Sequence, residues 1–226
     1  MIDNLALPPE WRALMQYLEE AKVRNEIKTF PLKSQQFSRA SKQLIMEVME
    51  DLGVPGSRAD KINFSFSVIY LFEHQKHLIF EPDYCFNRYR IITLRSSLYD
   101  KFHPLDIQKV RGFCRTKEKE ALKSGLKTVV WDNPSGKIIF GPSEQPGDFG
   151  GSGSSGWKYI ALCNFLMDLY CEENNLFLKR ITPYDSLMKE VKIHQISTPL
   201  KLKDVLFKEA IQKYISRLMK LDLSLS

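Results

Sequence analysis

The residues with the clearest chemical potential are the glycines and serines of residues 150–156, which read Gly-Gly-Ser-Gly-Ser-Ser-Gly. Backbone N–H groups exposed by glycines and followed by a helix N-terminus can bind phosphate. Gly151 and Gly156 have the separation of the two glycines of a P-loop, but Trp157 takes the place of the phosphate-binding lysine. One interpretation is therefore a phosphate- or nucleotide-handling enzyme that binds its ligand through Gly151, Ser152, Gly153, Gly156 and Lys158.

The composition of the same run favours a different interpretation. No side chain in residues 150–156 is larger than a hydroxymethyl group, and Gly/Ser tracts of this kind behave as flexible coils. We therefore predict an engineered linker that replaces a removed loop or joins two partner chains. On this interpretation residues 1–149 form an α+β segment. Residues 157–226 form a helical segment that packs on the first as one body and comes from the same gene product or from another.

Other patterns predict no catalytic residue, metal site or cofactor. His74 and His77 lie three residues apart beside Glu73, but a structural zinc site needs four ligands at characteristic spacings. Pro82-Asp83 and Glu190-Val191-Lys192 match a short pattern found in metal-dependent nucleases. Their wide separation and the shortness of the pattern favour coincidence.

A basic segment is a stronger candidate for a binding site. Between Arg88 and Lys127 the chain has eleven lysines and arginines against four acidic residues. A stripe of cations along a helix can contact phosphates, and nearby aromatic residues can stack on bases. Two other interpretations stay open: the cations form a solvated helix face without a ligand, or they bind an acidic protein partner. The predicted nucleic-acid-binding residues are Arg88, Arg90, Arg95, Arg111, Arg115, Lys119 and Lys123; the predicted stacking residues are Tyr84, Phe86, Tyr89 and Tyr99.

The elements that position these residues follow from hydrophobic periodicity and turn residues. The pattern predicts helices over 9–21, 35–52, 105–124, 157–171 and 204–221, and leaves 89–102 ambiguous. It predicts hairpins from 62–72 with 77–80 and from 127–131 with 137–140, and a further strand over 176–181. The expected fold is α+β, with a small, mainly antiparallel sheet of hairpins packed by several amphipathic helices.

Composition restricts the function classes. The 226 residues are 43% hydrophobic and carry a net charge of +6, which fits a folded domain and permits an acidic partner. The longest apolar stretch, 64–72, is too short for a membrane helix. Four scattered cysteines and no recognisable signal peptide predict a nuclear or cytoplasmic protein. We expect a non-enzymatic interaction module or complex subunit that binds a protein partner, and nucleic acid as a further partner, through its basic surface.

Overall fold

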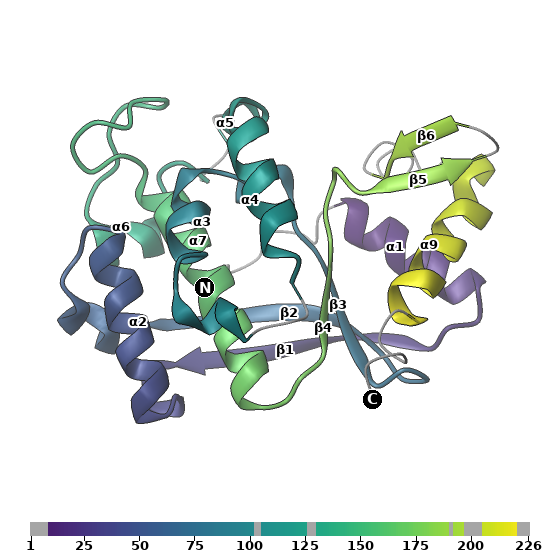
Figure 1. Cartoon of the computed structure of the whole chain (residues 1–226), viewed down its shortest axis with the longest axis horizontal. Helices are drawn as coiled ribbons and strands as arrows, with labels where there is room; N and C mark the ends of the chain where they lie inside the picture. The colour runs from purple at the N-terminus through teal and green to yellow at the C-terminus, as the bar shows by residue number, and fades with distance from the viewer. Residues whose placement is uncertain (1–8, 102–104, 126–129, 190–191, 197–204, 221–226) are drawn as a thin grey trace. The chain divides into compact units, whose positions relative to one another are not determined.

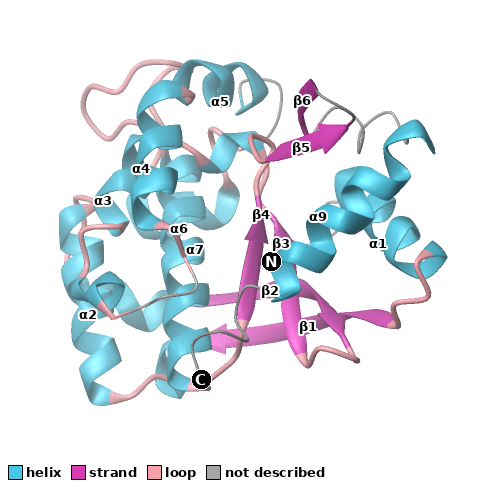
Figure 2. Ribbon diagram, turned by 45° about the vertical axis from the view of Figure 1, so that its right-hand side comes forward, coloured by secondary structure: helices cyan, strands magenta, loops and turns pink. Residues whose placement is uncertain are grey.

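The computed structural model describes residues 9–101, 105–125, 130–189, 192–196 and 205–220. Its elements confirm the predicted α+β fold (Figures 1 and 2). The helices are α1 (Pro9–Glu20), α2 (Arg39–Asp51), α3 (Arg88–Thr93), α4 (Ile107–Thr116), α5 (Glu118–Gly125), α6 (Pro134–Phe140), α7 (Ser155–Glu173) and α9 (Lys208–Lys220). The strands are β1 (Asn25–Lys33), β2 (Asn63–Leu71), β3 (Lys76–Phe80), β4 (Leu178–Ile181), β5 (Ser186–Lys189) and β6 (Lys192–Gln195).

Four strands form a mostly antiparallel sheet in the order β1-β2-β3-β4. β2 and β3 form the predicted antiparallel hairpin, with Ile69 opposite Leu78. β4 then pairs parallel to β3, with Phe80 opposite Ile181. β5 and β6 form a separate two-stranded antiparallel sheet.

The chain divides into two compact units. Unit 1 comprises residues 30–66 and 83–176, and unit 2 comprises the described parts of 3–29, 67–82 and 177–226. Two of the boundaries between the units fall within β1 and β2, which contribute residues to both, and the others among the described residues follow Pro82 and Leu176. The predicted segments 1–149 and 157–226 do not coincide with these units, because each unit contains residues from both sides of 150–156.

The core of unit 2 lies between α1, α9 and one face of the sheet. Alternating residues of the strands point to that face, and Ile69, Leu78 and Ile181 are fully buried there. Helical spacing brings Leu14 of α1 and Ile211 of α9 into the same cluster. The indole Nε1 of Trp11 donates to the carbonyl oxygen of Phe80 at 3.1 Å, so the buried indole is satisfied.

Unit 1 is built around α7, a helix with buried residues on most of its circumference. α3 and α6 pack against it. The ring of Tyr170 contacts the rings of Phe30 on β1 and Phe66 on β2, with centroids 5.8 Å and 5.9 Å away. Aromatic contacts therefore join α7 to the unit 1 ends of these strands.

The predicted hairpin of 127–131 with 137–140 is wrong. Residues 134–140 form α6, and residues 127–129 lie outside the described residues. Asn133 is the N-cap, since its side chain accepts a hydrogen bond from the Gly136 N–H at 3.1 Å. Pro134 follows at the first helical position, where its missing N–H costs nothing. The same residues that suggested a turn therefore begin a helix.

The predicted helix over 105–124 is two helices with a break at Lys117, which is the C-cap of α4. The ambiguous 89–102 segment forms α3 and a 3-10 turn, Ser97–Asp100. A second 3-10 turn, Ser34–Gln36, replaces the first turn of the predicted 35–52 helix, because Ser38 caps α2 by accepting from the Ser41 N–H. The remaining 3-10 turns are Gly56–Lys61, Asp83–Cys85 and Val205–Phe207.

Candidate functional site

The Gly/Ser segment is not the flexible coil that its composition predicts, because its last residues begin α7. Ser154 is fully buried and caps the helix by accepting a hydrogen bond from the Trp157 N–H at 3.0 Å. Its hydroxyl donates to the Trp131 carbonyl oxygen at 2.6 Å. The Gly156 N–H donates to the same oxygen at 3.0 Å. These bonds fix the segment to the residues that precede α6.

Two glycines of the segment are required by close approach. A Cβ atom at Gly156 would lie 1.9 Å from the Val130 carbonyl oxygen. At Gly153, where φ is +61°, it would lie 1.9 Å from the hydroxyl of Tyr89. Real Cβ atoms do not approach other atoms so closely, so these positions need glycine for packing.

The segment also lacks the features of a phosphate loop. The N–H groups of Gly150 and Ser152 donate to carboxylate oxygens of Asp148 and Glu144, at 2.8 Å and 3.1 Å. The N–H groups of 153–157 donate to backbone or hydroxyl oxygens of unit 1. Two carboxylates therefore hold amides that a phosphate would need.

Lys158 does not extend into solvent towards such a ligand. Its side chain is half-buried, and its Nζ lies 5.5 Å from the ring centroid of Tyr89 and 5.9 Å from that of Phe140. Burial lowers the pKa of this amine. The geometry of 150–158 thus argues against anion binding there.

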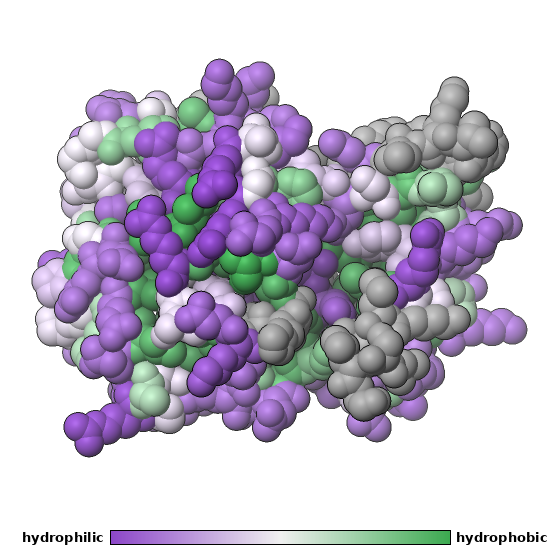
Figure 3. Space-filling model, in the orientation of Figure 1, coloured by the Kyte–Doolittle hydropathy of each residue, from purple (hydrophilic) through white to green (hydrophobic). Residues whose placement is uncertain are grey.

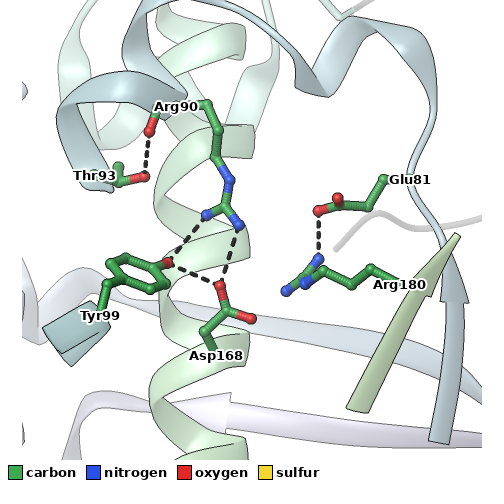
Figure 4. A network of polar contacts seen from close by, with 6 residues as sticks. All are labelled: Glu81, Arg90, Thr93, Tyr99, Asp168 and Arg180. Carbon is green, nitrogen blue, oxygen red and sulfur yellow. Dashed lines mark hydrogen bonds and ion pairs between the residues drawn. The ribbon is translucent and has the colours of Figure 1, made fainter. Parts of the chain in front are cut away.

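Arg90, one of the predicted nucleic-acid contacts, lies in the interior and forms an ion pair. Its side chain is 1% exposed, and Nη2 lies 3.1 Å from Oδ2 of the fully buried Asp168 of α7. The Tyr99 hydroxyl donates to the same oxygen at 2.8 Å and accepts from Arg90 Nη1 at 3.3 Å (Figure 4). The placement of Arg90 on the basic surface is therefore wrong.

Arg88 and Arg111 also make internal contacts. Arg88 forms a bidentate pair with Glu118 of α5, through Nε at 2.9 Å and Nη2 at 2.8 Å. Its guanidinium also lies 3.6 Å from the ring centroid of Phe149. Burial alone would raise the pKa of Glu118, but the bonds from Arg88 outweigh it and lower that pKa. Arg111 donates to the Leu94 carbonyl oxygen at 2.7 Å and so fixes α4 to the end of α3.

Five of the predicted contacts are exposed, and one of them, Arg88, is paired with Glu118. We call the other four the basic surface: Arg95, Arg115, Lys119 and Lys123. None of the four forms an ion pair with another described residue. Figure 1 shows α4 and α5 in succession, and in Figure 3 the same region is mainly hydrophilic, with hydrophobic residues visible between the hydrophilic ones. Lys119 and Lys123 lie one turn apart on α5, and Arg115 lies in the last turn of α4.

The carboxylates near the basic surface are largely occupied by other groups. Glu118 is paired with Arg88, and Glu120 with Lys117 at 2.8 Å. Asp106 caps α4 by accepting from the Lys109 N–H at 3.0 Å. Three of the four acidic residues in 88–127 therefore neutralise cations outside the basic surface or stabilise a helix terminus, and the fourth, Asp100, is exposed. The excess of basic over acidic residues in 88–127 favours a positive potential at this surface.

The predicted stacking residues serve the core. Phe86, Tyr89 and Tyr99 are between 1% and 8% exposed, and Tyr84 is only partly exposed. The ring of Phe86 packs edge-on against Phe113 of α4, with centroids 5.8 Å apart. The buried rings of Phe86, Tyr89 and Tyr99 offer no face for a nucleobase.

Sequence reasoning missed the buried charges of the interior. Asp168 is the one acidic residue in the apolar stretch 157–171, and a carboxylate among apolar residues of a helix signals a buried partner. In unit 2, Glu81 and Arg180 form a second buried pair (Figure 4). Asp185 accepts from the Thr182 N–H at 2.7 Å and from the Tyr214 hydroxyl at 2.8 Å. These groups stabilise the units from within.

The described residues contain no group of three or more His, Cys, Asp and Glu side chains placed to hold a metal ion. His74 is exposed in the turn between β2 and β3, whereas His77 is buried on β3, so they do not form a joint site. Glu190 and Val191 of the nuclease-like pattern lie outside the described residues. No helix among those described is long and apolar enough to cross a membrane.

The fold and surface define an α+β protein whose paired α4 and α5 helices carry exposed, uncompensated cations. The chain belongs to a family described as "Family of unknown function (DUF7255)", which matches residues 47–202. No curated protein and no solved structure matches this chain.

Proposed function

We propose that this protein is a non-enzymatic interaction module, or a subunit of a complex, that binds an anionic macromolecular partner through the basic surface. The observation that carries the proposal is the contrast in pairing around α4 and α5. Arg95, Arg115, Lys119 and Lys123 are exposed without a carboxylate partner among the described residues, while Glu118 and Glu120 are paired elsewhere. Exposed cations of one sign attract and orient polyanions.

The alternative, a phosphate-handling enzyme that uses residues 150–156, has less support. Its amides already donate to protein oxygens, and two of those oxygens are carboxylates. A nuclear or cytoplasmic location also stays a prediction, with the four free cysteines as its support.

A charge-reversal experiment tests the proposal. The variant carries Arg115→Glu, Lys119→Glu and Lys123→Glu, and its matched control carries Arg39→Glu, Lys42→Glu and Lys61→Glu, which are exposed cations of α2 and the turn after it. Both variants change the net charge equally. The probe is immobilised heparin, and the readout is the salt concentration at which each protein elutes, with circular dichroism to verify the fold.

We expect the wild type to bind, the control to elute close to it and the α4–α5 variant to elute at much lower salt. Equal shifts in the two variants would mean that net charge, not the basic surface, determines retention. Absence of wild-type binding to heparin and to any other polyanion would reject the proposed function.

A further inference from the structure

We infer that the basic surface binds double-stranded nucleic acid through its phosphates, without reading bases. This inference rests on the proposed function and specifies its partner. It depends on three observations: the spacing of the cations, the residues exposed between them and the burial of the aromatic residues Phe86, Tyr89 and Tyr99.

The spacing suits a phosphate backbone. Lys119 and Lys123 are four residues apart on α5, which corresponds to about 6 Å along a helix axis. Phosphates of one DNA strand advance by about 3.4 Å per nucleotide along the duplex. Successive lysines on α5 can therefore contact every second phosphate of a nucleic-acid strand that runs along the helix.

The exposed residues of α4 and α5 argue against an acidic protein as the partner. The exposed side chains on these two helices are all polar or charged, namely Gln108, Lys109, Arg115, Thr116, Lys119, Glu120 and Lys123. The large exposed hydrophobic residues of the described chain lie elsewhere, at Ile27, Ile138, Met188 and Leu206. Protein interfaces obtain most of their affinity from buried aromatic or apolar anchors. A surface without such anchors suits a ligand that is bound by charge.

The aromatic residues discriminate between duplex and single strand. Proteins that bind single strands without sequence preference stack the bases on exposed rings. Here Phe86, Tyr89 and Tyr99 are buried, and Arg90 is paired with Asp168. What remains is a set of cations that contact only the backbone, and a duplex presents its phosphates at fixed spacing.

The number of cations predicts the salt dependence. If Arg95, Arg115, Lys119 and Lys123 each neutralise one phosphate, the logarithm of the association constant falls with the logarithm of salt with a slope of about −3.6. Removing two of these charges reduces the magnitude of that slope by about 1.8. The binding constant changes little between unrelated sequences, because phosphate contacts carry no base information.

The experiment measures fluorescence anisotropy of labelled 20-base-pair duplexes of two unrelated sequences, of one of their single strands, and of polyglutamate, across a salt series. The proteins are the full chain, Lys119→Gln with Lys123→Gln, and the matched control Lys42→Gln with Lys61→Gln. We expect equal affinity for the two duplexes, weaker binding of the single strand, and a reduced slope for the α5 variant only.

The outcomes separate the inference from the proposed function. Tighter binding of the single strand, a strong difference between the two duplexes, or binding of polyglutamate alone overturns the duplex inference and leaves the basic surface as a binding site. An unchanged slope in the α5 variant, with wild-type duplex binding intact, places the duplex elsewhere on the protein and also overturns it. No binding to any of these probes rejects both proposals.

Discussion

At the scale of single residues, the interior of unit 1 depends on one charge placed among apolar side chains. Asp168 lies on α7 between residues that are almost fully buried, and both Arg90 and Tyr99 donate to its Oδ2. Removing a carboxylate from water is costly unless charge and hydrogen bonds replace the lost hydration. Three groups from α3, the turn after it and α7 must therefore occupy fixed positions together.

The first prediction concerns this network. Asp168→Asn leaves the Arg90 guanidinium buried without its counter-charge, and we expect the free energy of unfolding to fall by about 3–5 kcal/mol. Urea denaturation followed by circular dichroism measures the change. The triple variant Arg90→Met, Tyr99→Phe and Asp168→Leu removes the whole network, and we expect it to recover most of the loss. A loss below about 1 kcal/mol in Asp168→Asn would show that water satisfies Arg90.

The second prediction uses the lowered pKa of Glu118, which arises from its bonds to Arg88. A lowered pKa in the folded state stabilises the protein fully above the ordinary value of 4.5 and loses this effect as the pH falls through the folded value. We expect Glu118→Gln to lose about 1 kcal/mol at pH 7, as for a well-oriented surface pair. This deficit relative to wild type should shrink below about pH 4.5.

Urea titrations of the two proteins at pH 7, 4.5 and 3 measure the Glu118 effect. Glu50→Gln, at an exposed position of α2, is the control and should show no comparable deficit. A deficit for Glu118→Gln that stays constant over this pH range would contradict the electrostatic explanation.

At the scale of elements, the start of α7 depends on close contacts between residues 153–156 and other segments of unit 1. Gly153 and Gly156 face Tyr89 and the Val130 carbonyl at distances that exclude a Cβ atom. The Trp131 carbonyl oxygen accepts hydrogen bonds from Ser143, Ser154 and Gly156. The small residues of 150–156 are therefore a condition for bringing α6 and α7 together.

The third prediction tests this packing. Gly156→Ala should destabilise the protein by about 1–3 kcal/mol or more, because the new methyl group must displace backbone. Gly112→Ala is the control, because Gly112 lies in α4 with no atom within 4 Å of the added Cβ. It should stabilise the protein by about 0.5–1 kcal/mol, since alanine favours helix. Equal, small effects of the two changes in thermal denaturation would restore the flexible-linker interpretation.

Elements with strong periodicity could be predicted from sequence, and those decided by long-range packing could not. The patterns of α1, α7 and the β2–β3 hairpin are long enough to identify them. Asn133-Pro134 fits both a turn and a helix start, and burial of Ile139 and Phe140 accompanies the helix. The composition of 150–156 indicated a coil, because composition does not show which atoms pack against each glycine in the folded protein.

For the same reason, the sequence could not show which cations of 88–127 are exposed. Charge density identified the segment that carries Arg95, Arg115, Lys119 and Lys123, which are exposed as expected. It could not distinguish them from Arg90, whose partner Asp168 is 78 residues away in the chain. Pairing between distant residues decides which cations reach the surface.

At the scale of the whole molecule, two compact units share two strands. Residues 63–66 of β2 belong to unit 1 and residues 67–71 to unit 2, and β1 is divided in the same way. β2 lies between β1 and β3 in the sheet. Because β1 and β2 each contribute residues to both units, we expect the two units to unfold cooperatively.

The fourth prediction follows from this sharing. In native-state hydrogen exchange at increasing urea, the most protected amides of residues 63–66 and 67–71 should converge on the same free energy of opening. Amides at the C-terminal end of α9 serve as the comparison, because helix ends open locally at lower cost. Two separate free energies for the two halves of β2 would show that the units unfold independently.

The crowding around α7 has a consequence for the evolution of this chain. Among relatives of this protein, substitutions should be rare at Gly153 and Gly156, where any side chain collides with Tyr89 or the Val130 carbonyl. Ser152, which is exposed, should vary freely. The segment 150–156, whose composition resembles a flexible linker, should then contain both invariant and variable positions. The invariant positions should be those where the backbone packs closely against another part of the chain.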